Sequence, residues 1–323
     1  MTLDGPVRAR TTRRPQLPPQ VHVFVRDWLS SNNVLLRSAE GNVLVDTGYV
    51  KHAPLTLALV ASRVGLDGSR LSLIVNTHGH SDHIGGNAAL QRAYGCPIAV
   101  PDAEADVIDA WDERTLLLDY AGQRADRFGV DVRLRAGTTH RWGDLDWNVI
   151  AAPGHDQGAV VFYNPLHRML VSGDALWEDG FGFVMPAAME PGAIPAARAT
   201  LERLSNLPID VVIPGHGEPF RDVEGALGRA FSRLHALESD PHRAARHAVK
   251  VVFAFLLLDR ERIPLAALPA ELQRIGLFRD FDDHFFRLGP ERLAGWLVDA
   301  LERAGVAKVV DGVVAPRVAG GRR

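Results

Sequence analysis

The chain has 323 residues, 46% of them hydrophobic and 23% charged, and a formal net charge of −3. This length allows a large buried core and more than one domain, and the near-neutral charge excludes a general electrostatic attraction to nucleic acid. The single cysteine, Cys96, excludes an intramolecular disulfide and suits a reducing compartment; we expect it to be a buried core thiol.

The first 20 residues predict an extended, solvated arm. They hold four arginines between positions 8 and 14 and three prolines between positions 15 and 19, without the apolar segment of a secretion signal. We therefore expect a cytoplasmic protein. The longest apolar run, residues 251–258, predicts a buried helix and is too short for a bilayer, which needs about 20 residues, so we expect no membrane association.

From residue 21 onward, short apolar runs alternate with helical patterns. Strands are expected at 21–25, 33–37, 42–45, 71–75, 97–100, 132–134, 145–150, 159–163, 169–172 and 211–213, and helices at 54–64, 88–94 and 194–204. Groups of strands separated by helices predict an α/β fold in which sheets are covered by outer helical layers.

The segment directly after the strand at 71–75 carries an unusual density of metal-binding side chains. His78, His80, Asp82 and His83 lie within six residues, and histidine and aspartate bind zinc through nitrogen and oxygen. In an extended segment His78 and His80 point the same way, whereas Asp82 and His83 enter a turn or short helix and face a neighbouring position. The run therefore predicts two ligands for each of two adjacent metals.

Three further strands end in the same way, with a glycine followed by a residue that can bind a metal. These residues are His155, Asp174 and His216, after the runs at 149–154, 169–173 and 211–215. Each is expected in a tight turn at the tip of its strand. Because the pattern repeats, we interpret all three as metal ligands rather than ordinary loop residues.

This set of motifs resembles the metallo-β-lactamase superfamily. His78-x-His80-x-Asp82-His83, His155, Asp174 and His216 occur in the family's order, and Asp46-Thr47-Gly48 is similar to its first motif. The resemblance covers roughly residues 20–220. It implies a four-layer αββα sandwich with the metals in a cleft at one edge of the two sheets.

The resemblance also implies a role for each motif residue. It assigns one metal to three histidines, a second metal to an aspartate and two histidines, a bridging role to Asp174, and to Asp46 the orientation of a ligand. The ligands are, for the first metal, His78, His80 and His155, and, for the second, Asp82, His83 and His216. We expect two divalent ions, zinc by preference, with iron and manganese as alternatives because such sites accept several metals.

Two positions discriminate among branches of this superfamily. Asp174 disfavours the zinc β-lactamases, which generally lack a bridging aspartate, and His80 disfavours the flavodiiron branch. Two metals roughly 3.5–4 Å apart can hold a bridging hydroxide that attacks a carbonyl carbon or a phosphorus, and they stabilise the charge that develops on oxygen. Asp82 is expected to accept a hydrogen bond from this hydroxide and to help move its proton.

Two segments are candidates for the substrate-binding wall. Residues 103–128 interrupt the alternation of strands and helices, and they predict either an overhang of the cleft or an outer helix packed on a sheet. Residues 175–186 directly follow Asp174, with Trp177, Phe181 and Phe183 among glycines. These aromatic side chains either line a pocket or cover the core beneath a long loop.

The composition changes after His216, and we expect three segments: an arm at 1–20, a catalytic domain at 21–245 and a C-terminal domain at 246–323. A long helix is expected at 222–248, and further helices precede an Asp-Gly hairpin at 307–315. This order resembles a winged helix. From residue 241 onward, 14 Lys/Arg against 10 Asp/Glu give a balance of only about +4. Packing, homodimerisation or pocket closure is therefore favoured over nucleic-acid binding.

The leading hypothesis is a dinuclear metal hydrolase of a small-molecule ester, either a thioester or a lactone. One alternative is a nuclease or phosphodiesterase whose C-terminal domain holds nucleic acid, although the large insertion of the RNA-processing branch is absent from the sequence. A second is an iron-dependent persulfide dioxygenase, whose branch shares several of the motifs. A third, a non-catalytic binding protein, is disfavoured because the ligand set is complete.

Overall fold

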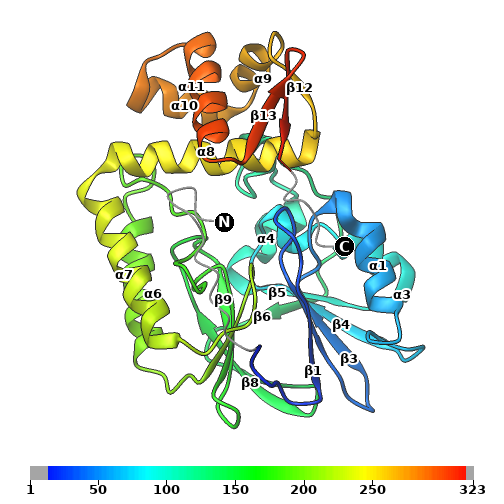
Figure 1. The fold of residues 1–323 in the computed structure, drawn as a ribbon. Coiled ribbons are helices and arrows are strands. Elements are labelled where there is room, and N and C mark those ends of the chain that lie inside the picture. Colours follow the sequence, from blue (N-terminus) through cyan, green and yellow to red (C-terminus); the bar gives the residue numbers. More distant parts are fainter. Residues whose placement is uncertain (1–13, 318–323) are drawn as a thin grey trace.

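The computed structural model describes residues 14–317. Most of the predicted arm at 1–20 lies outside the described residues. Within the described part, the chain folds into two sheets, the helices that cover them and a group of C-terminal helices (Figure 1). Among residues 14–317 no helix combines the length and the hydrophobicity needed to cross a membrane.

The first sheet has six strands in sequence order. The strands are β1 (Val21–Phe24), β2 (Asn33–Leu36), β3 (Asn42–Val45), β4 (Leu71–Val75), β5 (Ile98–Pro101) and β6 (Val132–Leu134). The first three strands are antiparallel, and β3 to β6 pair in parallel. Parallel neighbours need crossover connections, which contain η1 (Val50–His52), α1 (Ala53–Ala61), α2 (Ser81–Ile84), α3 (Asn87–Tyr94), α4 (Asp102–Ala110) and α5 (Leu118–Ala121).

The second sheet has five strands in the order β11-β10-β9-β8-β7. They are β7 (Thr139–Trp142), β8 (Leu145–Ala151), β9 (Val160–Asn164), β10 (Met169–Gly173) and β11 (Val211–Pro214). The sheet is antiparallel except for the β10–β11 pair. The connection between these two strands contains α6 (Ala193–Ser205).

The hydrophobic clusters define the layers. Val45 and Val75 from the first sheet share one buried cluster with Trp147, Phe162 and Ile213 from the second, so the sheets face each other. A second cluster joins the first sheet to α1, α3 and α4 and contains the buried Cys96, and a third joins the second sheet to α6 and α7 (Val223–Ser239). The expected four-layer αββα sandwich is confirmed.

The predicted single helix at 222–248 is wrong, because the chain breaks at Asp240 into α7 and α8 (Pro241–Arg260). The Asp240 carboxylate accepts a hydrogen bond from the backbone N–H of Arg243 at 2.8 Å, and Pro241 occupies the first helical position. Both features favour the start of a new helix. Because α8 runs across residues 245 and 246, it crosses the expected limit between the catalytic and C-terminal domains, which stays a prediction.

The C-terminal elements have a core of their own. Phe253 of α8 packs with Phe278, Phe281 and Leu297, all fully buried, so these phenylalanines form a core and do not line the cleft. The elements are α9 (Leu268–Arg274), α10 (Gly276–Phe281), the π-helical turn η2 (Asp282–Phe286) and α11 (Pro290–Arg303), with a small sheet of β12 (Ile263–Pro264), β13 (Ala307–Val310) and β14 (Val313–Pro316). The predicted hairpin is confirmed as the β13–β14 pair. Figure 1 shows α8 lying between this helical domain and the sandwich.

Candidate metal centre

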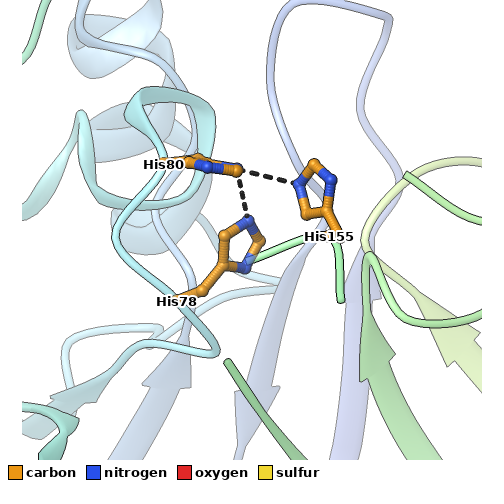
Figure 2. A group of neighbouring side chains, drawn as sticks. All are labelled: His78, His80 and His155. Carbon is orange, nitrogen blue, oxygen red and sulfur yellow. Dashed lines mark hydrogen bonds between the residues drawn. The ribbon is translucent and has the colours of Figure 1, made fainter. Parts of the chain in front are cut away.

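Three histidine side chains converge at the edge of the two sheets (Figure 2). His78 and His80 come from the loop between β4 and α2, and His155 comes from the loop after β8. His80 Nδ1 lies 3.1 Å from His78 Nε2 and 2.8 Å from His155 Nε2. The three nitrogens therefore point at one small volume, where a metal ion could take all three as ligands.

Two carboxylates and two histidines form a second group beside the first. Asp82 and His83 start from α2, while Asp174 and His216 follow β10 and β11. His216 Nε2 lies 3.0 Å from Asp82 Oδ2, and His83 Nε2 lies 3.9 Å from the same oxygen. All seven residues predicted as ligands are thus brought together in two adjacent groups.

Asp174 stands between the two groups and its oxygens face histidines of both, with Oδ2 also lying 3.8 Å from His216 Nε2 of the second group. Its Oδ2 lies 3.4 Å from His155 Nε2 of the first group, and its Oδ1 lies 3.4 Å from His83 Nε2 of the second. Close packing requires a small residue at Gly215, where a Cβ atom would lie only 2.2 Å from Asp174 Oδ1. The glycine before His216 therefore lets the β11 loop approach the carboxylate.

Histidines of the two donor groups have pKa values shifted in opposite directions. Burial and three neighbouring imidazoles hold the pKa of His78 well below its ordinary value, and burial together with His155 lowers the pKa of His80 to about 4. Burial also disfavours the charged form of His83, but the carboxylates of Asp46, Asp174 and Asp82 outweigh it and raise the pKa of His83 well above its ordinary value. His78 and His80 of the first group are therefore neutral nitrogen donors, whereas carboxylate charge dominates the surroundings of His83 in the second.

Asp46 orients His83, as the sequence predicted. Its Oδ2 lies 2.8 Å from His83 Nδ1, and the buried carboxylate also accepts hydrogen bonds from the backbone N–H and the hydroxyl of Thr77 at 2.9 and 2.8 Å. A hydrogen bond at Nδ1 leaves Nε2 as the ligand atom. Among the described residues no hydrogen-bond partner is found for this buried Nε2, which faces the second group.

The carboxyl groups of Asp156 and Glu104 form a pair beside the first donor group, and the sequence analysis missed both. His80 Nε2, the ring nitrogen not facing the other histidines, lies 3.7 Å from Asp156 Oδ2. Burial and the adjacent Asp156 raise the pKa of the Glu104 carboxyl well above its usual range, so this group keeps its proton and can donate to Asp156. The sequence held a signal for Asp156, because this residue directly follows the candidate ligand His155.

The residues present fit two divalent metal ions. Seven nitrogen and carboxylate donors, five of them buried, converge in two groups joined by one carboxylate. Without metal ions, the buried Nε2 of His83 has no hydrogen-bond partner among residues 14–317, an arrangement that is otherwise unfavourable. The donor chemistry suits zinc and other first-row divalent ions.

Two cavities that share lining residues lie at the centre. The slot, as we name the smaller one of about 80 Å³, has Asp82, His155, Asp174 and His216 in its floor and side chains of α5, α8 and α10 in its walls. The basin, of about 840 Å³, lies beside it and is lined by Arg229, Arg233 and Arg243 together with several acidic residues. Trp28, Trp177, Phe183, His216 and Val251 border both cavities.

Both predicted wall segments contribute to the slot and also to the core. Leu117 and Ala121 of the 103–128 segment line the slot, whereas α4 of the same segment packs on the first sheet. From the 175–186 segment, Trp177 and Phe183 line the slot, and Phe181 is buried in the core. Trp28 was missed, because it stands in a loop before β2 without a recognisable motif.

Comparison with known proteins agrees with this geometry. The model of the metallo-β-lactamase superfamily matches residues 26–216, which is more than half of the chain and includes all seven candidate ligands. The chain belongs to this superfamily. It is therefore a member of a metallo-hydrolase family, and its two donor groups are candidate sites for the metals.

The similar curated proteins include thioester hydrolases. A hydroxyacylglutathione hydrolase of Rhodopseudomonas palustris is 31% identical over 193 residues, covering 56% of this chain and 66% of the relative. The acyl-coenzyme A thioesterase MBLAC2 of Bos taurus is 28% identical over 218 residues, covering 61% of this chain and 76% of the relative. The chain spans between 44% and 66% of the length of four of these hydroxyacylglutathione hydrolases and 68% of a fifth.

Solved structures show the same fold. The protein TTHA1623 in a di-iron-bound form is 29% identical, with a TM-score of 0.51 over 65% of this chain and 96% of that chain. The metallo-β-lactamase family protein TTHA1429 from Thermus thermophilus is 22% identical, with a TM-score of 0.55 over 94% of this chain and 100% of that one. The second likeness therefore extends to the C-terminal elements.

Proposed function

We propose that the protein is a dinuclear metal-dependent thioester hydrolase. The observation that carries this proposal is the Asp174 carboxylate, whose two oxygens each lie 3.4 Å from a histidine of a different donor group. A carboxylate in this position suits two metals that share it. We infer that His78, His80 and His155 hold one metal ion and that the other is held by Asp82, His83 and His216.

The metals, when bound, supply an acidified water as nucleophile and positive charge that stabilises the developing oxyanion. Asp82 supplies a base. Although burial raises the pKa of Asp82, His83 and His216 hold it below its ordinary value, so its charged carboxylate can take a proton from water. Asp46 keeps a proton of His83 on Nδ1 through the 2.8 Å contact, and Trp28, Phe255 and Leu277 give the slot apolar walls.

A thioester is favoured over a lactone because the similar curated proteins include a hydroxyacylglutathione hydrolase and an acyl-coenzyme A thioesterase. The two cavities also suit a substrate with two unequal parts. The apolar slot of about 80 Å³ fits a small acyl group, and the polar basin of about 840 Å³ fits a larger carrier. We propose zinc as the metal, with iron as the alternative suggested by the di-iron form of TTHA1623.

We further propose that the C-terminal helices form a winged-helix-type domain that closes the pocket. Its support is the contribution of Val251, Val252, Phe255 and Leu277 to the slot. A nuclease role gains no comparable support. Homodimerisation stays a prediction, which light scattering can test.

The test is hydrolysis of a panel of acyl thioesters and lactones by protein whose metal content is measured. We expect about two metals per chain, thioester turnover that a chelator abolishes, and recovery when metal is restored. Protein that contains two metals but hydrolyses neither class, or turnover that survives complete metal removal, would refute the proposal. One iron per chain with oxygen uptake on a persulfide would instead identify the dioxygenase alternative.

A further inference from the structure

The Asp174 carboxylate must keep one orientation if two donor groups are to share it. The torsion about the last bond of an aspartate side chain is broad, so the residue does not fix the plane of its carboxylate by itself. The nitrogens that face this carboxylate belong to candidate ligands, at 3.4 Å in His83 and His155 and at 3.8 Å in His216. An imidazole nitrogen that binds a metal has no proton to donate. A donor outside the two groups can hold the carboxylate before metals bind and can stay in place afterwards.

Trp177 supplies such a donor. Its indole Nε1 donates to Asp174 Oδ1 at 3.1 Å, and this is the oxygen that faces His83. The contact is shorter than those between the carboxylate and the three imidazoles. Because an indole N–H is a donor only, the direction of this bond does not depend on a tautomer.

The backbone around Trp177 is folded tightly against the residue that it serves. The N–H of Trp177 donates to the carbonyl of Gly180 at 2.7 Å, and the two residues form an isolated antiparallel bridge. The N–H of Gly182 donates to the carbonyl of Asp174 at 2.8 Å, so the segment turns back onto its own start. Gly180 has a φ of +123°, a conformation that suits glycine alone. The turn therefore fixes where the indole lies.

The indole of Trp177 also packs against a second candidate ligand. Its ring centroid lies 5.2 Å from that of His216, and the ring of Trp28 lies 5.8 Å from Trp177 and 4.9 Å from His216. Both tryptophans border the slot and the basin. The two side chains thus share their cavities and their contact with His216, but among residues 14–317 only Trp177 of this pair forms a hydrogen bond with Asp174.

We propose that Trp177 is a positioning residue whose indole N–H holds the Asp174 carboxylate in the orientation that both donor groups share. Without this N–H, the carboxylate can turn and Oδ1 loses its donor. Loss of an outer-shell partner typically lowers metal affinity by roughly 10- to 100-fold. The inference rests on the bridging role of Asp174 in the proposed function, but metal binding tests it whatever the substrate is.

The experiment separates the N–H from the ring that carries it. One variant is Trp177→Phe, and in another β-(3-benzothienyl)alanine is incorporated at position 177, which keeps the bicyclic shape but has sulfur in place of N–H. Metal-free proteins are titrated with zinc by calorimetry, and the bound zinc is counted by mass spectrometry. We expect both variants to lose roughly 10- to 100-fold in affinity for one of the two zinc ions. Trp28→Phe, the matched control, should keep both zinc affinities.

Turnover of S-acetyl-N-acetylcysteamine at saturating zinc gives a second readout. Both changes at position 177 should lower kcat, because the carboxylate is no longer held, whereas Trp28→Phe should alter mainly KM, because it changes only a cavity wall. The benzothienyl variant keeps the packing, so it decides the outcome if Trp177→Phe folds poorly.

Two results would overturn the inference. Wild-type zinc affinity in the benzothienyl variant would mean that the ring acts through packing alone, and equal losses of affinity in Trp28→Phe and Trp177→Phe would mean that any change beside His216 has this effect. Wild-type protein that binds two zinc ions without hydrolysing any thioester would refute the proposed function, and the zinc titrations would still decide the role of Trp177.

Discussion

Replacing Asp46 by asparagine tests how the centre is held together. The carboxylate accepts three hydrogen bonds, two from Thr77 and one from His83 Nδ1. Asparagine offers one oxygen and one NH₂ group. If its oxygen keeps the bond from the Thr77 backbone, the NH₂ group faces the Thr77 hydroxyl and His83 Nδ1. The hydroxyl can turn to accept, but the imidazole must move its proton from Nδ1 to Nε2.

That move blocks the nitrogen that we assign to the second metal. His83 Nε2 points towards Asp174 and Asp82, at 3.4 and 3.9 Å, and a protonated nitrogen cannot bind a metal. Loss of an outer-shell partner typically costs 10- to 100-fold in metal affinity, or about 1.4–2.7 kcal/mol. We expect Asp46→Asn to weaken the second site by this amount and the first site, whose histidines do not contact Asp46, much less.

The assay is a metal titration of metal-free protein by isothermal calorimetry, with the bound metal counted by mass spectrometry. Asp131→Asn is the matched control, because Asp131 also accepts a backbone N–H, from Ile98 at 2.9 Å, but is not part of either donor group. It should leave both affinities unchanged. Wild-type affinity at both sites in correctly folded Asp46→Asn would refute the tautomer argument.

Three further changes test other parts of the molecule. Asp174→Ala removes the shared carboxylate and should lower metal content and turnover together; unchanged stoichiometry and rate would contradict its bridging role. Glu104→Gln keeps a donor for Asp156 and should retain stability, whereas Glu104→Leu should lose about 1–3 kcal/mol in chemical denaturation. In the folded protein the pKa of Glu104 is raised above that of an ordinary carboxyl group. Wild-type stability therefore falls as the pH rises from the ordinary carboxyl pKa to the raised one, and the Tm of Glu104→Gln should gain on that of the wild type over this window. A Tm difference between the two proteins that does not change with pH would contradict this. Phe281→Ala empties a fully buried position in the C-terminal core and should destabilise that domain by about 3–5 kcal/mol, measured as an earlier unfolding transition.

Much of the centre could be predicted because its residues follow a local rule. Each candidate ligand comes directly after an apolar strand, and glycines mark the turns that present His155, Asp174 and His216. The alternation of short apolar runs with helical patterns along the chain likewise indicated sheets covered by helices. The break between α7 and α8 had a local signal as well, since Asp240 followed by Pro241 is a typical helix start, and the continuous apolar pattern on both sides concealed it.

The slot could be predicted only in part: the segments 103–128 and 175–186 were expected as its walls, but the way they meet the other walls depends on contacts between segments that are far apart in the sequence. Gln123 follows a four-residue helix, Trp28 stands in a loop, and Leu277 belongs to a C-terminal helix. Nothing in their local sequence distinguishes them from core residues. They meet only because α5 and α8 pack over the edge of the sheets at which the candidate metal ligands lie. The motifs therefore indicate the chemistry of the centre. We expect substrate choice to depend on the packing of the C-terminal helices, so variants at this contact should change specificity before they change metal binding.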